Sequence, residues 1–399
     1  MRQTFLNFSP PLLGEEEIAE VVDTLRSDWI TTGPKTRRFE QEFAQFANAP
    51  AALAVSSGTD AMLVALAALG VGPGHEVITT TMTFCSTVHV IEHVGARPVL
   101  VDVEPDTLNI DPQQVASAVT PRTRAIMPVH LYGHPCDMDA LYAIARQHGL
   151  HVVEDAAHAV SAKYKGHPIG CPADLAPVAS GSATQPSNLV SFSFYATKNL
   201  TTAEGGMLTG NAEVIEQARV WSLHGMSRDA YKRYTAAGSW YYEVVCPGFK
   251  CNMTDIQAAL GIHQLRKLPR FQQRRREIVR RYNRAFAECP ALELPVERPQ
   301  VESAWHIYPI RLNLEALTID RARFIQELKD RNIGTSVHFI PNHLHPYYRD
   351  KYGFRPDQFP IAYAAYQRLI SLPLNPRMTD QDADDVVGAV LDVVAAYRR

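Results

Sequence analysis

The sequence reads LVSFSFYATKNLTTAEGG from Leu189 to Gly206, a stretch that joins an apolar strand pattern, a lysine and a glycine-rich turn. Ser193 stands five residues before Lys198, near the end of the expected strand. A hydroxyl at this distance from a lysine is compatible with a site in which the lysine forms a Schiff base with an aldehyde that carries a phosphate. The stretch therefore indicates a site for pyridoxal 5′-phosphate (PLP). A surface lysine in a loop is the ordinary alternative, which the rest of the sequence has to test.

A second strand pattern reads HVVEDAAH from His151 to His158 and places Asp155 at its carboxyl end. Ligands of open α/β sheets collect at that end of the strands. PLP needs an anion beside its pyridine nitrogen, because the protonated ring is the electron sink that stabilises a carbanion. Asp155 suits this role. The alternative is an ordinary helix cap, since Asp is a favoured N-cap residue.

A third pattern reads AALAVSSGTD from Ala51 to Asp60 and is followed by an Ala/Leu-rich helical stretch. A short strand, a turn of small residues and a helix leave free backbone N–H groups and the positive end of the helix dipole where a phosphate can dock. Gly58 and Thr59 are the expected cradle. Ser-Gly-Thr before a helix is also a common N-cap, so this pattern indicates a phosphate site only in combination with the other two.

Short apolar strands alternate with segments of helical length through the first part of the chain. Such an alternation predicts βαβ units and a mostly parallel sheet that helices cover on both faces. The expected strands span residues 76–80, 97–101, 124–129, 151–154, 189–194 and 206–209. The sequence thus predicts an α/β fold whose large αβα domain covers residues 1–256.

The last part of the chain has a different pattern. From about residue 257 a long charged helix leads to an expected strand at 304–312, a helix at 321–331 and an amphipathic helix at 379–397. This order predicts a smaller α+β domain over residues 257–399.

Composition agrees with a large enzyme for small ligands. The 399 residues are 46% hydrophobic and carry a formal net charge of −3, which gives no electrostatic reason to expect nucleic acid or an anionic membrane as partner. No stretch approaches the ~20 apolar residues of a membrane span, and the first residues lack the apolar core of a secretory signal. We therefore predict a cytoplasmic protein. The six cysteines form no CxxC pair and are expected to be free thiols.

Three other segments need an interpretation. HVIEH at residues 89–93 matches the pattern of an inverted zinc protease, but no third ligand is evident, so we expect an ordinary helix and no metal. GVGPG at residues 70–74 follows a helix instead of a strand, which favours a helix-to-strand turn over a dinucleotide loop. Residues 172–187 are rich in Pro, Ala and Ser and interrupt the large domain as a long loop, whose role the sequence leaves open.

With these residues in place, the chain resembles the DegT/DnrJ/EryC1/StrS family of PLP-dependent sugar aminotransferases, over nearly its whole length. The resemblance implies fold type I architecture, as in aspartate aminotransferase. The matching segments are residues 29–34, 57–59, 128–133, 154–158, 164–166, 192–194 with Lys198, 204–206, 224–225, 248–255 and 305–306. Residues 81–84, 156–160 and 250–255 are most similar to the members that aminate a UDP-linked 4-keto arabinose. The 172–187 insertion departs from the family pattern.

The resemblance assigns roles by position. Lys198 would be the Schiff-base lysine and proton shuttle, and Asp155 would face the pyridine nitrogen. His158 would approach the phenolic oxygen of the cofactor, and Phe84 would stack on its ring, although a single apolar residue is also ordinary core packing. The phosphate would be held by Ser57, Gly58, Thr59 and Ser193.

The resemblance also implies a homodimer with shared active sites. Asn252 and Lys250 would reach the cofactor phosphate and the substrate of the neighbouring subunit. Many relatives have Asn and Arg at these two places, which makes Lys250 a departure. Thr32, Lys250 and His338 are the expected substrate contacts.

The implied reaction is the transfer of an amino group from glutamate to a keto group of a nucleotide-linked sugar, with 2-oxoglutarate as the other product. A UDP-4-keto sugar is the favoured acceptor, and a dTDP-keto sugar or a nucleotide-free cyclic ketone is the alternative. A PLP-dependent sugar dehydratase is less compatible, because that branch of the family has histidine where this chain has Lys198. A binding protein without activity is the remaining alternative, and visible absorbance of bound cofactor would distinguish it from an enzyme.

Overall fold

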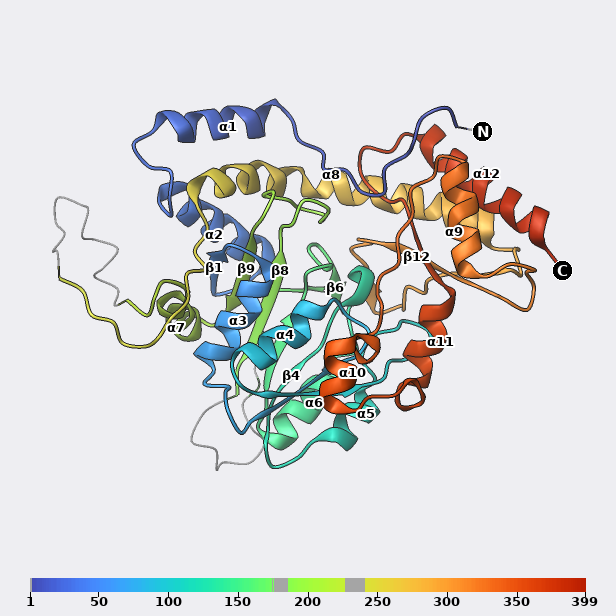
Figure 1. Cartoon of the computed structure of the whole chain (residues 1–399). Coiled ribbons are helices and arrows are strands. Elements are labelled where there is room, and N and C mark those ends of the chain that lie inside the picture. The colour runs from blue at the N-terminus through green and yellow to red at the C-terminus, as the bar shows by residue number, and fades with distance from the viewer. Residues whose placement is uncertain (1, 174, 176–185, 227–240) are drawn as a thin grey trace.

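A computed structural model describes residues 2–173, 175, 186–226 and 241–399 (Figure 1). A seven-stranded sheet with the order β1-β9-β8-β5-β4-β2-β3 forms the centre of the larger part of the molecule. Neighbouring strands run parallel except at β9, which is antiparallel to both β8 and β1. The strands are β1 (Ala51–Val55), β2 (Glu76–Thr80), β3 (Arg97–Val101), β4 (Thr123–Met127), β5 (His151–Asp155), β8 (Asn188–Ser193) and β9 (Gly206–Gly210). The predicted α/β fold with a mostly parallel sheet is confirmed.

Helices cover both faces of this sheet. Successive side chains of a strand point to opposite faces, so Val152 packs into one apolar core and Val153 into the other. The core that contains Val152 also takes side chains from α2 (Pro34–Ala47), α5 (Pro112–Ala118), α6 (Met138–His148) and the first half of α8 (Asp255–Phe286). The core that contains Val153 takes them from α3 (Gly58–Ala68), α4 (Cys85–His93) and α7 (Ala212–Ser222). Strands that are buried on both sides explain the continuous apolar runs in the sequence.

Strand β9 runs antiparallel to its neighbours, whereas a simple series of βαβ units would make it parallel. Residues 194–205 connect β8 to β9 without a helix, and the backbone N–H of Phe194 donates to the carbonyl of Gly205. A parallel return needs a crossover to the other end of the sheet, usually through a helix, whereas this connection has no helix and brings the chain back antiparallel. The same connection carries Lys198.

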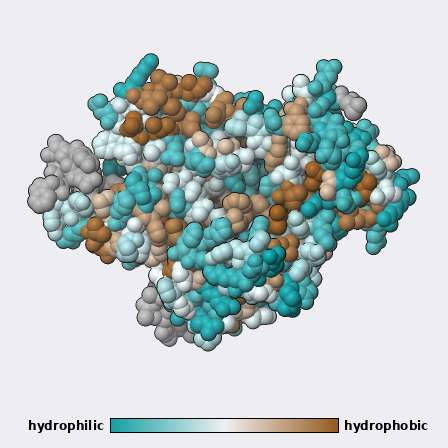
Figure 2. Space-filling view, viewed as in Figure 1, coloured by the Kyte–Doolittle hydropathy of each residue, from teal (hydrophilic) through white to brown (hydrophobic). Residues whose placement is uncertain are grey.

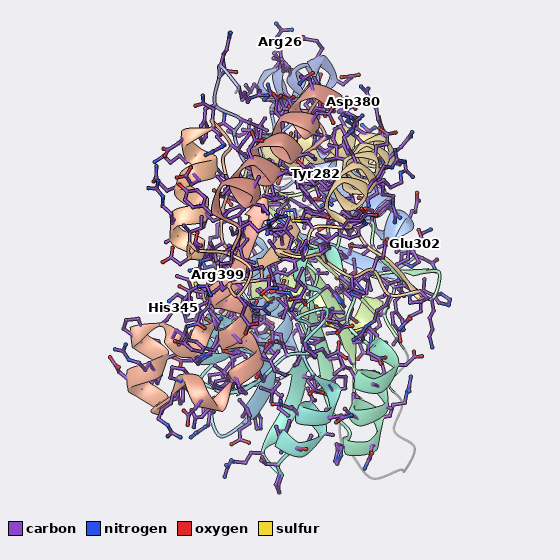
Figure 3. The ribbon with its side chains drawn as sticks, turned by 90° about the vertical axis from the view of Figure 1, so that its right-hand side faces the viewer. Arg26, Tyr282, Glu302, His345, Asp380 and Arg399 are labelled. Atoms are coloured by element: carbon purple, nitrogen blue, oxygen red, sulfur yellow. The ribbon has the colours of Figure 1, made fainter. Side chains whose placement is uncertain are left out.

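A second core lies in the C-terminal part of the chain. It is built on the sheet β10-β12-β13, where β10 is Leu292–Glu293, β12 is Tyr308–Leu312 and β13 is Leu369–Leu372. The helices α9 (Arg321–Asp330), α12 (Asp380–Tyr397) and the second half of α8 pack on it. Tyr282 of α8 is fully buried here and donates to the carbonyl of Pro373 at 2.8 Å; Figure 3 shows it near Asp380, the first residue of α12.

The boundary at residue 257 stays a prediction, because both parts of the chain cross it. Helix α8 runs through residues 255–286 and contributes side chains to both cores. In the other direction, Leu6 packs into the second core and pairs with Ile333.

The predicted strand 304–312 is wrong in its first four residues. Trp305 has a φ of 45°, and the N–H groups of Ala304 and His306 donate to the carbonyls of Gly133 and Tyr132. This segment is therefore bound to the 3-10 turn η1 (Leu131–Gly133), and β12 begins only at Tyr308. Sequence alternation could not reveal this contact, because its partners are about 170 residues away.

A small sheet and three short elements complete the structure. The sheet β11-β6-β7 joins Val301–Glu302 to Lys163–Tyr164 and His167–Pro168. The elements η3 (Asn342–Leu344), α10 (Pro346–Tyr352) and α11 (Pro360–Arg368), with the turn η4 (Pro356–Gln358) between the two helices, pack against α4 and β3. The carboxylate of Asp102 accepts the N–H groups of Ile361 and Ala362, which fixes the start of α11 on the large sheet.

The structure answers the interpretation of two of the three segments whose role the sequence left open. Residues 70–74 form the helix-to-strand turn expected, with φ near 68° at Gly70 and 83° at Gly74. Residues 89–93 lie in α4, where Glu92 accepts hydrogen bonds from Tyr347, Lys351 and Tyr352. The 172–187 insertion falls mostly outside the described residues. Among the helices that the structure describes, none is long and apolar enough to cross a membrane.

Candidate active site

The carboxyl ends of β5 and β8 meet the turn between β1 and α3 at one edge of the large sheet. β5 and β8 are parallel neighbours, with Asp155 opposite Ser191. The three segments line a cavity of about 360 Å³, within the range of roughly 300–1,000 Å³ that is usual for small ligands. Every cofactor residue expected from the sequence except Asn252 lies in its wall: Ser57, Gly58, Thr59, Phe84, Asp155, His158, Ser193 and Lys198.

Lys198 lies in a turn that its own backbone stabilises. Its N–H donates to the carbonyl of Tyr195, and the N–H of Thr202 closes the loop on the carbonyl of Phe194. Burial lowers the pKa of the Lys198 amine to about 8, although the carboxylate of Asp155 acts in the opposite direction. A substantial share of this amine is neutral near physiological pH, which makes it a nucleophile.

Asp155 is almost fully buried at the end of β5. Its Oδ1 accepts the N–H of Ala157 at 3.1 Å, and its Oδ2 accepts the hydroxyl of Thr87 at 2.8 Å. No helix follows it, because residues 156–162, all described, form turns. The helix-cap alternative is therefore wrong, and Asp155 lines the same cavity as Lys198.

The turn at the start of α3 has the shape of an anion cradle. The first N–H groups of a helix have no partner within the helix, so those of Gly58 and Thr59 are available to a phosphate. A Cβ on Gly58 would lie 2.8 Å from the Cβ of Ser193, and one on Gly206 would lie 2.4 Å from the carbonyl of Ser57. These close approaches require glycine at both positions. The Ser57 hydroxyl accepts the N–H of Asp60 and so starts the helix.

His158 is neutral and has a defined tautomer. Burial, then the nearby Lys198 and His338, hold its pKa well below the usual value. Its Nδ1 accepts the N–H of Tyr132 at 3.2 Å, so the neutral ring carries its proton on Nε2. His158 can therefore donate one hydrogen bond from Nε2, as contact with a phenolic oxygen requires.

Phe84 is not a core residue, because it is 56% exposed although it lies in the cavity wall. Its ring centroid is 5.9 Å from that of Phe339, which lines the cavity from the C-terminal part of the chain. An exposed aromatic ring at the mouth of a cavity is suited to stack on a planar ligand.

His306 was not expected among the site residues, although Trp305-His306 belongs to the matching segments. Its ring centroid lies 4.4 Å from that of His158. Its Nδ1 lies 3.0 Å from Oδ1 of Asn199, whose Nδ2 donates to the carbonyl of Ala304, so the neutral ring carries its proton on Nδ1. In the sequence, only the resemblance could have indicated that His306 belongs to the site. Its hydrogen-bond partner Asn199 is 107 residues away along the chain, so no local pattern connects the two.

The expected substrate residues fall into two groups. His338 lies in the cavity wall, where its Nδ1 is 2.8 Å from the Ser371 hydroxyl, and burial and Lys198 lower its pKa to about 4. Thr32, Lys250 and Asn252 form a separate hydrogen-bonded group outside this wall. Asn252 donates to the Thr32 hydroxyl at 2.7 Å and accepts from Lys250. Within one chain, the structure does not bring these three residues to Lys198.

The donor set fits PLP. The anion cradle suits its phosphate, Asp155 suits a protonated ring nitrogen, and Lys198 suits its aldehyde. No group of three or more His, Cys, Asp or Glu side chains among the described residues is placed to hold a metal ion.

The fold is that of PLP-dependent transaminases of fold type I. A Streptococcus pneumoniae structure assigned as a sugar aminotransferase superposes in its PLP form with a TM-score of 0.88 and 37% identity, over 98% of this chain and 99% of that one. Its PMP form gives a TM-score of 0.89 and 38% identity over the same shares. PseC of Helicobacter pylori, an aminotransferase in pseudoaminic acid biosynthesis, gives 0.87 and 26% identity over 99% of this chain and all of that one.

The chain belongs to the DegT/DnrJ/EryC1/StrS aminotransferase family, whose model matches residues 11–391. It is 51% identical over 395 residues to the spore coat polysaccharide biosynthesis protein SpsC of Bacillus subtilis, with 98% of each chain covered. It is 49% identical to an uncharacterized protein of Methanocaldococcus jannaschii over the full length of both. The protein is thus a transaminase of the sugar aminotransferase type, with PLP as its cofactor.

Proposed function

We propose that this enzyme transfers the amino group of glutamate to the keto group of a nucleotide-linked sugar, with a UDP-linked 4-keto sugar as acceptor. The observation that carries the proposal is the Lys198 amine, with a pKa of about 8, in one cavity with the buried Asp155 carboxylate. The relatives support a sugar acceptor, since SpsC is named for polysaccharide biosynthesis and PseC for pseudoaminic acid biosynthesis. Residues 250–255 favour the UDP-linked 4-keto class.

The residues of the cavity would hold the cofactor by its charged ends. The N-terminus of α3, with Gly58 and Thr59, would bind the phosphate together with Ser193, and Asp155 would accept a hydrogen bond from the ring nitrogen. Phe84 would cover one ring face, and Nε2 of His158 would donate to the phenolic oxygen. Bound PLP supplies the electron sink that stabilises negative charge on the substrate carbon.

Lys198 would move the proton of the reaction. A free amine whose pKa lies near 8 can both accept a proton at Nζ and return it at neutral pH. The neutral histidines His158, His306 and His338 place no positive charge beside it, because burial keeps each of their pKa values below the usual one. Lys198 is then the group in the cavity wall that is suited to the transfer.

We propose a homodimer in which each site takes residues from both chains. Helix α1 (Glu15–Arg26) supports this, because its inner side is polar and its outer side is apolar. Glu17 is fully buried and accepts from Gln264 and Lys267, whereas Ile18 and Leu25 are 52% and 59% exposed. Figure 2 shows the apolar patch at the place of α1. Such a face is normally covered by a partner.

A second copy of the chain is the partner that the position of α1 favours. After α1 the chain leads through Trp29, whose indole donates to the carbonyl of Thr32. Thr32 then binds Asn252, next to Lys250. A copy that covers α1 would approach this group, which lies outside the cavity of its own chain and would complete the cavity of the other.

The test of the reaction is a panel of UDP- and dTDP-linked keto sugars and one nucleotide-free cyclic ketone, each assayed with glutamate and the purified PLP-loaded protein. We expect 2-oxoglutarate and an amino sugar with a UDP-linked 4-keto sugar. Amination of the dTDP sugars alone would overturn the UDP assignment, and amination of the free ketone alone would overturn the nucleotide link. Borohydride reduction should fix the cofactor on Lys198, and a label on another lysine would contradict its role.

A further inference from the structure

The side chain of Asp155 is held by a hydroxyl that the sequence did not single out. Thr87, in α4, is fully buried, and its Oγ1 lies 2.8 Å from Oδ2 of Asp155. The other carboxylate oxygen accepts the N–H of Ala157 at 3.1 Å. Each oxygen thus has one protein donor, which fixes the plane of the carboxylate.

The hydrogen bonds around Thr87 have a single possible direction when Asp155 is ionised. A carboxylate can only accept, so the one hydroxyl proton of Thr87 goes to Asp155. Thr83 lies 2.8 Å from Thr87, oxygen to oxygen, and must then donate to it. The result is a directed chain from Thr83 through Thr87 to Asp155, in which each bond strengthens the next.

The start of this chain is anchored by the C-terminal part of the molecule. The side-chain amide of Asn342 donates to the carbonyl of Thr83 at 2.8 Å, and its backbone N–H donates to the carbonyl of Thr81. Asn342 and Thr83 are both buried. The loop that carries Thr83 and Phe84 therefore has a fixed position relative to Asp155.

We propose that Thr87 is a positioning residue that keeps the Asp155 carboxylate aimed at the ring nitrogen of the cofactor, and that Thr83 orients the Thr87 hydroxyl. Donors to the charged form of a carboxylate stabilise that form, and two donors fix its direction. Without the hydroxyl, the carboxylate would lose the contact that fixes its direction and would no longer be held toward the ring nitrogen. This inference rests on the proposed role of Asp155.

The experiment uses the full chain loaded with PLP that carries ¹⁵N at the ring nitrogen. The ¹⁵N chemical shift, followed against pH, separates the protonated from the neutral ring and does not depend on turnover. Thr87→Val removes the hydroxyl and keeps the shape, and Thr87→Ser keeps the hydroxyl. Thr79→Val is the matched control, because Thr79 is also fully buried and donates to the carbonyl of Met127, away from Asp155.

We expect Thr87→Val to lower the pH at which the ring nitrogen loses its proton by about one unit or more, because a carboxylate that turns away weakens the hydrogen bond from the ring nitrogen, and a hydrogen bond to a charged group corresponds to about a ten- to hundredfold change in an equilibrium. Thr87→Ser and Thr79→Val should match the parent protein, and Thr83→Val should give a smaller shift than Thr87→Val. The kcat should fall with Thr87→Val while the KM for glutamate changes little.

The possible failures can be told apart. If Asp155→Asn changes the ¹⁵N titration but Thr87→Val does not, the role of Thr87 is overturned and that of Asp155 survives. Equal shifts with Thr87→Val and Thr87→Ser would show a packing effect and overturn the hydroxyl argument. An unchanged titration in Asp155→Asn would overturn the proposed role of Asp155 itself. If Thr87→Val does not fold, Thr83→Val and Thr87→Ser still decide, because a titration in Thr83→Val like that of the parent would contradict the directed chain.

Discussion

Gly58 and Ser193 approach each other so closely that a Cβ atom on Gly58 would lie 2.8 Å from the Cβ of Ser193. Gly58 begins α3, and Ser193 ends β8. The absent side chain lets the helix N-terminus and the serine hydroxyl face the same small space. The phosphate cradle therefore depends on the missing side chain of Gly58, as it does on that of Gly206.

Gly58→Ala should weaken PLP binding by at least about tenfold, because a Cβ only 2.8 Å from the Cβ of Ser193 and 3.1 Å from its Cα forces the turn to shift and misplaces the N–H groups. The dissociation constant of PLP, from titration of the visible absorbance, measures the effect. Gly72→Ala is the control, since a Cβ there would meet only one atom, at an ordinary distance of 3.5 Å. Equal affinity in the two variants would contradict the cradle.

Asp155→Asn should lower kcat by about 10²–10³-fold, because the amide is no anion for the ring nitrogen and an electrostatic group at a reacting centre contributes on this scale. The fold should persist, since one amide oxygen can still accept from Thr87 or Ala157. Steady-state kinetics and circular dichroism check both points. Asp111→Asn is the control, because Asp111 is a true helix cap and Asn caps equally well. Near-normal turnover in folded Asp155→Asn would remove Asp155 from the site.

Lys198→Met should stabilise the protein without cofactor at pH 7. Burial lowers the pKa of Lys198 from 10.5 to about 8, so the folded state carries a cost for the charged amine at every pH below 8. The cost declines as the pH rises from 8 to 10.5, where the folded state releases its proton before the unfolded one. Because Lys198 keeps some contact with solvent, we expect a gain on the order of 2 kcal/mol at pH 7 that disappears near pH 10.5.

Urea unfolding of the two proteins at pH 7, 9 and 10.5 measures this difference. A gap that does not change with pH would mean that packing, and not the lowered pKa, causes it.

Lys198→Ala and Asn252→Ala chains, each inactive alone, should regain activity when mixed under conditions of subunit exchange. If Asn252 serves the neighbouring chain, one of the two sites in a mixed dimer is intact, and about a quarter of the parent activity is the expected order of recovery for random exchange. Lys198→Ala mixed with Asp155→Asn is the control, because both residues line the cavity of the same chain and no site is restored. Absence of recovery in the first mixture would reject the interface role of Asn252.

Leu25→Lys should weaken the dimer by at least about tenfold, since it places a charge in the outer apolar face of α1. Sedimentation velocity over a range of concentrations gives the dissociation constant. Val296→Lys is the control, because Val296 is also exposed but lies far along the chain in the C-terminal part. A monomeric parent protein, or an unchanged dimer in Leu25→Lys, would contradict the proposed interface.

The sequence alone determined the class of fold and the main reacting groups. Val152 and Val153, like Leu189 and Val190, are adjacent apolar residues that point to opposite faces of their strands, a pattern that indicates a strand buried between two layers of helices. Asp155 ends one such strand, Gly58 and Lys198 follow within five residues of others, and strand ends in an open sheet meet at one edge. The neighbouring sequence was enough to predict that these residues belong to the site, because the adjacent strand sets the position of each.

Tertiary structure decided what depends on contacts between distant segments. Thr87 and Asp155 are 68 residues apart, and His306 and Asn199 are 107 apart, so neither pair has a periodic or local signal. The connection that carries Lys198 has no helix and returns the chain antiparallel in β9, and the contact with Tyr132 delays the start of β12 to Tyr308. The polar inner side of α1 was likewise decided by Gln264 and Lys267 of α8. Periodicity reports which side chains avoid water, whereas these features depend on which polar group meets which, and only the folded chain brings those groups together.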